Sequence, residues 1–161
     1  MAPSLVNFRP YEEPKVESHS LQRRVSGERG VPGCHRTSRP LGTECRALDI
    51  AQPDVARAGG MTEIRRIAAL TSAHGVRLAP HAWGSGVLFA ASIHVAMAAP
   101  NCHILEVSQG YMPMMWELFN EAFDIRPDGM VHAPDRPGLG FTLRADALER
   151  FRYVDGPEYK F

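Results

Sequence analysis

Three short apolar segments follow one another at almost equal intervals along the chain. Residues 48–52, 76–79 and 103–107 start 28 and then 27 residues apart, and each has the length and apolar character of a buried strand. Residues 62–74 and 87–99, which lie between them, have the composition of helices. A strand and a helix that alternate at a constant interval predict an α/β fold with a parallel sheet covered by helices.

The same interval limits the size of the sheet. Eight such units would need about 220 residues, and a complete (β/α)8 barrel has about 250. The 161 residues provide for about four units. The spacing therefore leaves two architectures open, a doubly wound domain of modest size and a part of a (β/α)8 barrel.

Local signals set the expected ends of the helices. Thr62 is a candidate N-cap for the first helix, and Gly75 is expected to end it in a left-handed conformation. Pro53 ends the first strand, and Pro100 ends the second helix, because proline lacks the backbone N–H that continues either structure.

Residues 15–47 differ in composition from the rest. Only eight of these 33 residues are apolar, seven are basic, and none is Ile, Met, Phe, Trp or Tyr. Such a segment buries too little apolar surface to offset its ordering entropy. We expect an irregular or disordered segment with rapid amide exchange.

Composition argues against several classes of protein. The 18 basic residues are balanced by 18 acidic residues, whereas nucleic-acid binders need a basic excess. The longest apolar run, 87–100, is too short to span a bilayer, and no signal peptide precedes the chain. The three cysteines have no C-x-x-C spacing, so neither a disulfide framework nor a zinc site is expected. We therefore expect a cytoplasmic protein without a nucleic-acid or membrane partner.

Polar side chains follow the expected strands in the order acid, imidazole, acid. Asp54 comes after the first strand, His81 after the second, and Glu106 lies at the end of the third. Asp54 and His81 are separated by 27 residues, one full repeat, and adjacent parallel strands lie about 4.8 Å apart. We predict that the two side chains face each other. A carboxylate on one imidazole nitrogen fixes the tautomer, so that the other nitrogen can act as a general base.

Structural roles for the same residues remain open at this stage. Asp54 could cap the following turn, His81 could be a satisfied loop histidine, and Glu106 could pair with a surface arginine. A Ser-His-Asp triad with Ser85 is disfavoured, because Ser85 is not in a G-x-S-x-G elbow and lies only four residues from His81. We interpret four other histidines as structural: His74, His94, His103 and His132.

Several linked motifs resemble one family of enzymes. DIAQPDV at 49–55 followed by GGMTE at 59–63 is similar to the sixth-strand segment of the enolase superfamily, in its mandelate racemase subgroup. APHAWG at 79–84 resembles the seventh strand, and Leu105-Glu106 resembles the eighth. The segment 128–140 resembles the part that returns to the capping domain. The resemblance covers residues 48 to about 154.

The resemblance implies the C-terminal part of a (β/α)8 barrel that removes the proton α to the carboxylate of a hydroxy acid or acid sugar. His81 would be the general base or acid, Asp54 its partner, and Glu106 a hydrogen-bonding group for the substrate carboxylate. Trp83 would contact the substrate, and the P-H-x-W-G pattern is most similar to sugar-acid dehydratases and galactarolactone cycloisomerases. Dehydration is the expected outcome, with racemisation or cycloisomerisation as alternatives. A bound Mg²⁺ would stabilise the enediolate.

The metal site departs from the family pattern. Tyr11-Glu12-Glu13-Pro14 resembles a motif that ends the fourth strand, which points to Glu12, and Gly27-Glu28 lies where a further ligand is expected. Only 12 residues separate Pro14 from Gly27, too few for a helix and a strand. We therefore expect residues 1–14 to be the remnant of a strand end, residues 15–47 to reflect a deletion or a shifted frame, and residues 155–161 to be a tail. An inactive fragment is the alternative to a magnesium-dependent lyase, and a homo-oligomer that closes the sheet is a third.

Overall fold

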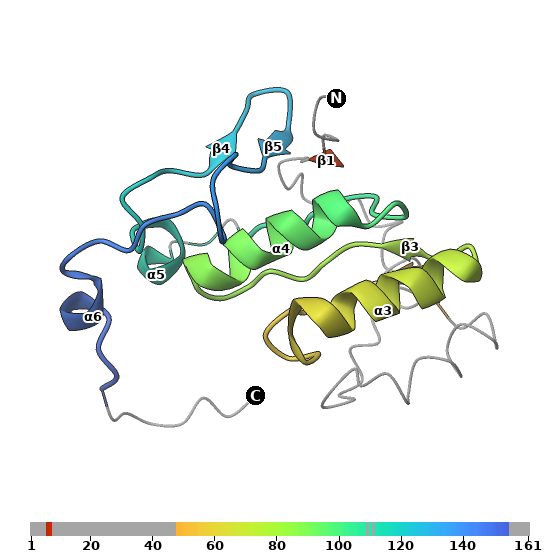
Figure 1. Ribbon diagram of the computed structural model, residues 1–161, viewed down its shortest axis with the longest axis horizontal. Coiled ribbons are helices and arrows are strands. Elements are labelled where there is room, and N and C mark those ends of the chain that lie inside the picture. Colours follow the sequence, from red (N-terminus) through yellow and green to blue (C-terminus); the bar gives the residue numbers. More distant parts are fainter. Residues whose placement is uncertain (1–5, 8–47, 109, 111, 155–161) are drawn as a thin grey trace.

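The computed structural model describes residues 6–7, 48–108, 110 and 112–154 (Figure 1). The elements, in chain order, are β1 (Val6–Asn7), β2 (Ile50–Ala51), α3 (Gly60–Ala73), β3 (Arg77–Leu78), α4 (Gly86–Ala98), α5 (Pro113–Trp116), β4 (Asp124–Ile125), β5 (Met130–His132) and α6 (Ala147–Arg150). The predicted alternation of strands and helices is present between β2 and α4. Residues 15–47 and 155–161 lie outside the described residues, so the expectations for them stay predictions.

The centre of the α/β part is a parallel pair of strands. Ile50 of β2 pairs with Arg77 of β3, and Ala51 pairs with Leu78. On the other side of β3, Leu78 forms a parallel bridge with Cys102, and its carbonyl accepts a 2.8 Å hydrogen bond from the His103 N–H. Three chain segments therefore run parallel in the order of the sequence.

The third segment is not the regular strand that we predicted over residues 103–107. After the Leu78 bond, the next ladder hydrogen bond from β3 would start at residue 80, and Pro80 has no N–H to donate. The contact resumes where the Glu106 N–H donates to the Pro80 carbonyl at 3.3 Å. Proline thus interrupts the ladder and leaves two points of contact with an irregular stretch between them.

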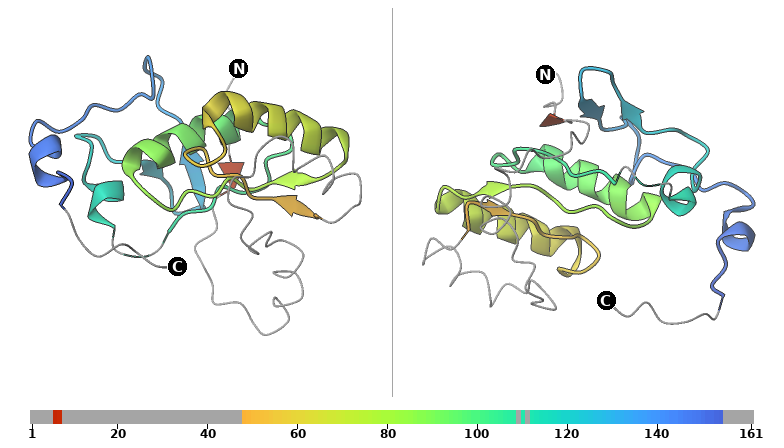
Figure 2. Two further views of the ribbon diagram at one scale, coloured as in Figure 1. Left: turned by 90° about the horizontal axis from the view of Figure 1, so that it is seen from below. Right: turned by 180° about the vertical axis from the view of Figure 1, so that it is seen from behind.

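Helices α3 and α4 lie side by side along this sheet (Figures 1 and 2). The N-cap of α3 is Gly59, not Thr62 as predicted, because Gly59 and Gly60 both adopt left-handed φ angles and allow the helix to begin earlier. Gly75 follows the C-terminus of α3 with φ at 69°, and the Val76 N–H returns to the Thr71 carbonyl at 2.9 Å. The predicted helix end at Gly75 is confirmed.

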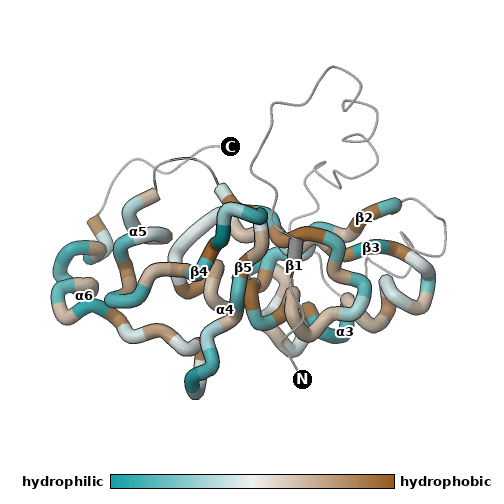
Figure 3. The backbone as a smooth tube through the Cα atoms, turned by 90° about the horizontal axis from the view of Figure 1, so that it is seen from above, coloured by the Kyte–Doolittle hydropathy of each residue, from teal (hydrophilic) through white to brown (hydrophobic). Residues whose placement is uncertain are grey.

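The core lies between the sheet and these two helices. The largest fully buried side chains come from α3, α4, β3 and the third segment: Phe89, Ile64, Ile67, Leu78, Ile93 and Leu105. In Figure 3 hydrophobic positions concentrate around the central strands, whereas hydrophilic positions dominate around α6. In the described part of the chain, no helix has both the length and the apolar character needed to cross a bilayer.

The C-terminal part packs against the first turns of α4. Strands β4 and β5 form an antiparallel hairpin, and β1 pairs with the other edge of β5. An added Cβ on Gly86 would lie 2.9 Å from the Met115 carbonyl, so this glycine lets α4 and α5 approach closely. Edge-on and stacked aromatic contacts fill the space beyond, among Phe89, Trp116, Phe119, Phe123 and Phe141.

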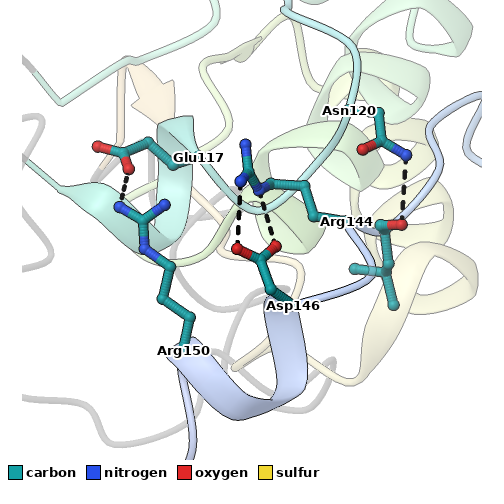
Figure 4. A network of polar contacts seen from close by, with 6 residues as sticks. Glu117, Asn120, Arg144, Asp146 and Arg150 are labelled. Atoms are coloured by element: carbon teal, nitrogen blue, oxygen red, sulfur yellow. Dashed lines mark hydrogen bonds and ion pairs between the residues drawn. The ribbon is translucent and has the colours of Figure 1, made fainter.

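Polar contacts fasten the returning chain around α6 (Figure 4). Phe119 forms an antiparallel bridge with Leu143, and the Asn120 side chain donates to the Leu143 carbonyl at 3.4 Å. Arg150 of α6 pairs with Glu117. Together these contacts hold the segment after β5 beside α5, on the same side as the beginning of α4.

Candidate active site

The carboxyl ends of β2 and β3 bring the two predicted side chains together. Asp54 and His81 form a parallel bridge, and the His81 N–H donates to the Pro53 carbonyl at 3.1 Å. The two strands stay in register from Ile50 to Asp54, so residues one repeat apart become direct neighbours. The ends of parallel strands are where α/β proteins place their active sites.

The side chains of this pair are hydrogen-bonded. The distance from His81 Nδ1 to Asp54 Oδ2 is 2.8 Å. The Asp54 side chain is 8% exposed and that of His81 is 32% exposed. The prediction that the two side chains face each other is confirmed. With the carboxylate ionised, the proton of the neutral imidazole lies on Nδ1, which leaves Nε2 as the proton acceptor.

The second carboxylate oxygen of Asp54 holds the following turn. Oδ1 accepts hydrogen bonds from the Ala56 N–H at 2.8 Å and from the Arg57 N–H at 3.1 Å. The main-chain carbonyl of Asp54 accepts from Ala58 at 2.8 Å. The alternative interpretation of Asp54 as a turn cap is therefore also correct: one oxygen binds the turn and the other binds the imidazole.

The surroundings shift both pKa values in the directions that strengthen the pair. For Asp54, burial raises the pKa, but the hydrogen bonds from His81, Ala56 and Arg57 outweigh it, so the pKa lies below its usual value. For His81, the hydrogen bond to Asp54 raises the pKa, burial opposes this, and the negative charge of Glu106 raises it further. The net result is a His81 pKa above its ordinary value, which suits a group that accepts a proton.

Glu106 lies beside the pair on the third segment. Its N–H donates to the Pro80 carbonyl at 3.3 Å, next to His81, and its charge acts on the imidazole. Glu106 is exposed. The structure thus places all three predicted residues at one end of the sheet.

Trp83 and Ser85 lie in the loop that follows His81. Trp83 is 68% exposed, two residues beyond the imidazole. Ser85 is the N-cap of α4, and its hydroxyl accepts a hydrogen bond from the Leu88 N–H at 3.4 Å. This capping role agrees with the sequence argument against a nucleophilic serine. A structural role also holds for His94, whose Nε2 donates to the Leu139 carbonyl at 3.0 Å.

The metal ligands suggested by the sequence are not part of this site as described. Glu12 and Glu28 lie outside the described residues. Among the residues that the structure describes, no group of three or more His, Cys, Asp or Glu side chains could hold a metal ion. The described residues therefore do not form a magnesium site.

One charged residue near the pair was missed by the sequence analysis. Arg57 lies in the turn held by Asp54, and its positive charge lowers the pKa of His81, against the effect of Glu106. The available signal was its position three residues after Asp54, which returns the chain toward the strand end within one turn.

The chain is similar to known enzymes over this same region. The family model described as enolase C-terminal domain-like matches residues 41–147. The D-galactarolactone cycloisomerase of Agrobacterium fabrum is 38% identical over 117 residues, which are 68% of this chain and 31% of that protein. A D-galactonate dehydratase family member of Streptomyces bingchenggensis is 38% identical over 135 residues, 74% of this chain and 32% of that protein. The chain thus spans about a third of the length of these relatives.

Solved structures give the same result. A putative mandelate racemase from Bordetella bronchiseptica superimposes with a TM-score of 0.71 at 27% identity, covering 76% of this chain and 32% of that one. An enolase-superfamily member from Polaromonas has a TM-score of 0.66 at 34% identity, covering 79% of this chain and 34% of that one. With the family model matching well over half of its residues, the chain belongs to the enolase superfamily, as a member of the enolase C-terminal domain-like family related to mandelate racemase and the sugar-acid dehydratases.

Proposed function

We propose that Asp54 and His81 are the proton-transfer pair of an enzyme that removes the proton α to the carboxylate of a hydroxy acid or acid sugar, with loss of water as the outcome. The observation that carries the proposal is the 2.8 Å hydrogen bond between His81 Nδ1 and Asp54 Oδ2 at the ends of adjacent parallel strands. The names of several relatives support the substrate class, since they are dehydratases of galactonate, xylonate and arabinonate.

The proposed step uses both nitrogens of His81. Nε2 accepts the α-proton, and the imidazolium that forms is stabilised by the ionised Asp54 carboxylate on Nδ1. The lowered pKa of Asp54 keeps that carboxylate ionised at neutral pH. The same imidazolium can then return a proton to the departing hydroxyl or to the carbon, so dehydration, racemisation and cycloisomerisation share this step.

Two further residues belong to the proposal. Glu106 would hydrogen-bond the substrate carboxylate as negative charge develops on it, and Trp83 would contact the substrate carbon chain. Both are exposed at the end of the sheet where His81 lies, so neither is buried away from a bound substrate. As part of a larger sheet, residues 48–154 would correspond to the C-terminal strands of a (β/α)8 barrel.

A magnesium requirement is also part of the proposal, because it is what the family resemblance implies. The described residues do not fit a magnesium site, so ligands would have to come from Glu12, Glu28 or another chain, and no step above is derived through the metal. This observation favours a second candidate, a fragment that keeps the proton-transfer pair and is inactive by itself. In that case the intact chain, given Mg²⁺ and a set of sugar acids, yields no dehydrated product.

One experiment separates the two candidates. Residues 48–147 of this chain replace the matching segment of the Agrobacterium fabrum cycloisomerase, so that the pair is placed in a full-length relative. We expect the chimera to exchange the α-proton of a sugar acid in D₂O, detected by ¹H NMR, and His81→Asn to abolish the exchange. A folded chimera whose exchange is unaffected by His81→Asn would refute the proposed role. The intact chain, assayed in parallel, reports whether it is active without the graft.

A further inference from the structure

The turn after β2 presents a cationic side chain next to the proton-transfer pair. Arg57 donates its N–H to Asp54 Oδ1 at 3.1 Å and to the Asp54 carbonyl at 3.2 Å. The backbone of Arg57 is therefore tied directly to the carboxylate that holds His81. Arg57 itself is exposed, so its guanidinium is accessible to a ligand in solvent.

The guanidinium of Arg57 differs from those of most described arginines. Five of these are engaged in ion pairs: Arg66, Arg126, Arg136, Arg144 and Arg150. Within the described ranges, the Arg57 side chain has no such carboxylate partner, although Asp54 and Glu106 are close to the same imidazole. A planar guanidinium with its donors unused is suited to binding a carboxylate in two parallel hydrogen bonds.

The charges around His81 create a need for such a cation. Asp54 and Glu106 are both acidic, and a hydroxy acid approaching His81 is an anion as well. Like charges at such distances repel by about 1 kcal/mol even in water-like surroundings, and by more where water is excluded. Arg57 opposes these carboxylates, as its effect on His81 shows.

We propose that the Arg57 guanidinium binds a carboxylate of the acid substrate and so positions the anion beside His81. The proposal rests on the proposed function, since it assigns a residue to the binding of that substrate class. Arg57 binds the ligand and takes no part in proton transfer.

The test measures anion binding and does not depend on turnover. The full chain is labelled with ¹³C in its histidine rings, and the His81 signal, assigned by its loss in His81→Asn, is followed while galactarate is added at constant ionic strength. Galactitol, the uncharged polyol with the same carbon chain, is the control ligand. Arg57→Gln removes the charge, Arg57→Lys keeps it without the bidentate geometry, and Arg65→Gln is the matched control on the exposed surface of α3.

We expect galactarate, but not galactitol, to shift the His81 signal in the wild type. The dissociation constant should rise about tenfold in Arg57→Gln, by less in Arg57→Lys, and not at all in Arg65→Gln. The titration midpoint of His81 in the free chain should also move upward in Arg57→Gln. An unchanged galactarate affinity in Arg57→Gln, or no response of the wild type to galactarate, overturns the proposal. A chimera that lacks His81-dependent exchange would refute the proposed function instead, and the two failures are read from different measurements.

Discussion

Replacing Asp54 separates its two roles. In Asp54→Asn the amide oxygen can still accept from the Ala56 and Arg57 N–H groups, while the amide nitrogen faces His81 Nδ1. The imidazole must then accept at Nδ1 and carry its proton on Nε2, which is the wrong tautomer for a base. In Asp54→Ala both the turn and the imidazole lose their partner.

The expected magnitudes follow from the hydrogen bonds that each variant loses. A charge-assisted bond contributes about 1.5–3 kcal/mol, and the value near the lower end applies here because the His81 side chain is 32% exposed. Asp54→Asn keeps a neutral bond in its place, so we expect a loss of about 1 kcal/mol in the free energy of unfolding. Asp54→Ala additionally leaves two backbone donors without their acceptor, at about 1 kcal/mol each, so we expect a loss of about 4 kcal/mol. In the chimera, either variant should lower α-proton exchange by about 10²–10⁴-fold.

The pH dependence gives the pair a signature of its own. Because the folded-state pKa of His81 is raised above its ordinary value of 6.5, its contribution to stability is fully present below pH 6.5 and is lost as the pH rises through the folded-state pKa. Because the pKa of Asp54 is lowered below 3.8, its contribution is present above pH 3.8 and is lost as the pH falls through the folded-state pKa. The wild type should therefore exceed Asp54→Asn most between about pH 4 and pH 6.5.

Urea unfolding of the three proteins at pH 5.5 and pH 8.5 measures these differences. The reasoning is wrong if Asp54→Asn matches the wild type at both pH values, since the pair would then contribute nothing to the folded state. It is also wrong if Asp54→Asn and Asp54→Ala are equally destabilised, because Oδ1 would then not be holding the turn.

Three other predictions test the surroundings of the site. Ser85→Ala removes an N-cap with a long 3.4 Å bond and should lower the free energy of unfolding in urea by about 0.5–1 kcal/mol, without lowering α-proton exchange in the chimera. Burial raises the pKa of Cys102 to about 11, so peptide mapping after iodoacetamide treatment at pH 8 should show its alkylation about a hundredfold slower than in urea. An added Cβ on Gly140 would lie 2.2 Å from Pro134 Cγ, whereas one on Gly138 meets nothing within 4 Å, and both glycines have positive φ. Gly140→Ala should therefore lower the thermal midpoint clearly more than Gly138→Ala, and equal losses would contradict this packing.

The sequence was sufficient for the features that depend on spacing. Parallel strands of equal register convert a 27-residue repeat into lateral contact, which is why Asp54 and His81 could be paired without coordinates. The α-helix ends at Gly75 for an equally local reason, the left-handed conformation that glycine adopts easily.

Features that depend on three-dimensional competition were not predictable in the same way. The cap rule favours Thr62, yet a pair of left-handed glycines starts α3 two residues earlier. The third strand appears regular in sequence, but its regularity is lost through Pro80 in the neighbouring segment. A residue list also cannot show that the two oxygens of Asp54 bind different partners, so capping and pairing looked like alternatives when both occur.

The two-sided bonding of Asp54 changes what its presence in a sequence signifies. Since Oδ1 holds the turn that leads into α3, a chain under selection only to remain folded would still favour an acid or amide at this position. Drift after a loss of activity would therefore erase His81, which is less buried and bonds to one partner through its ring, sooner than Asp54. Among sequences descended from the same ancestor, the imidazole is the informative character for retained chemistry, and the carboxylate mainly records that the fold has been kept.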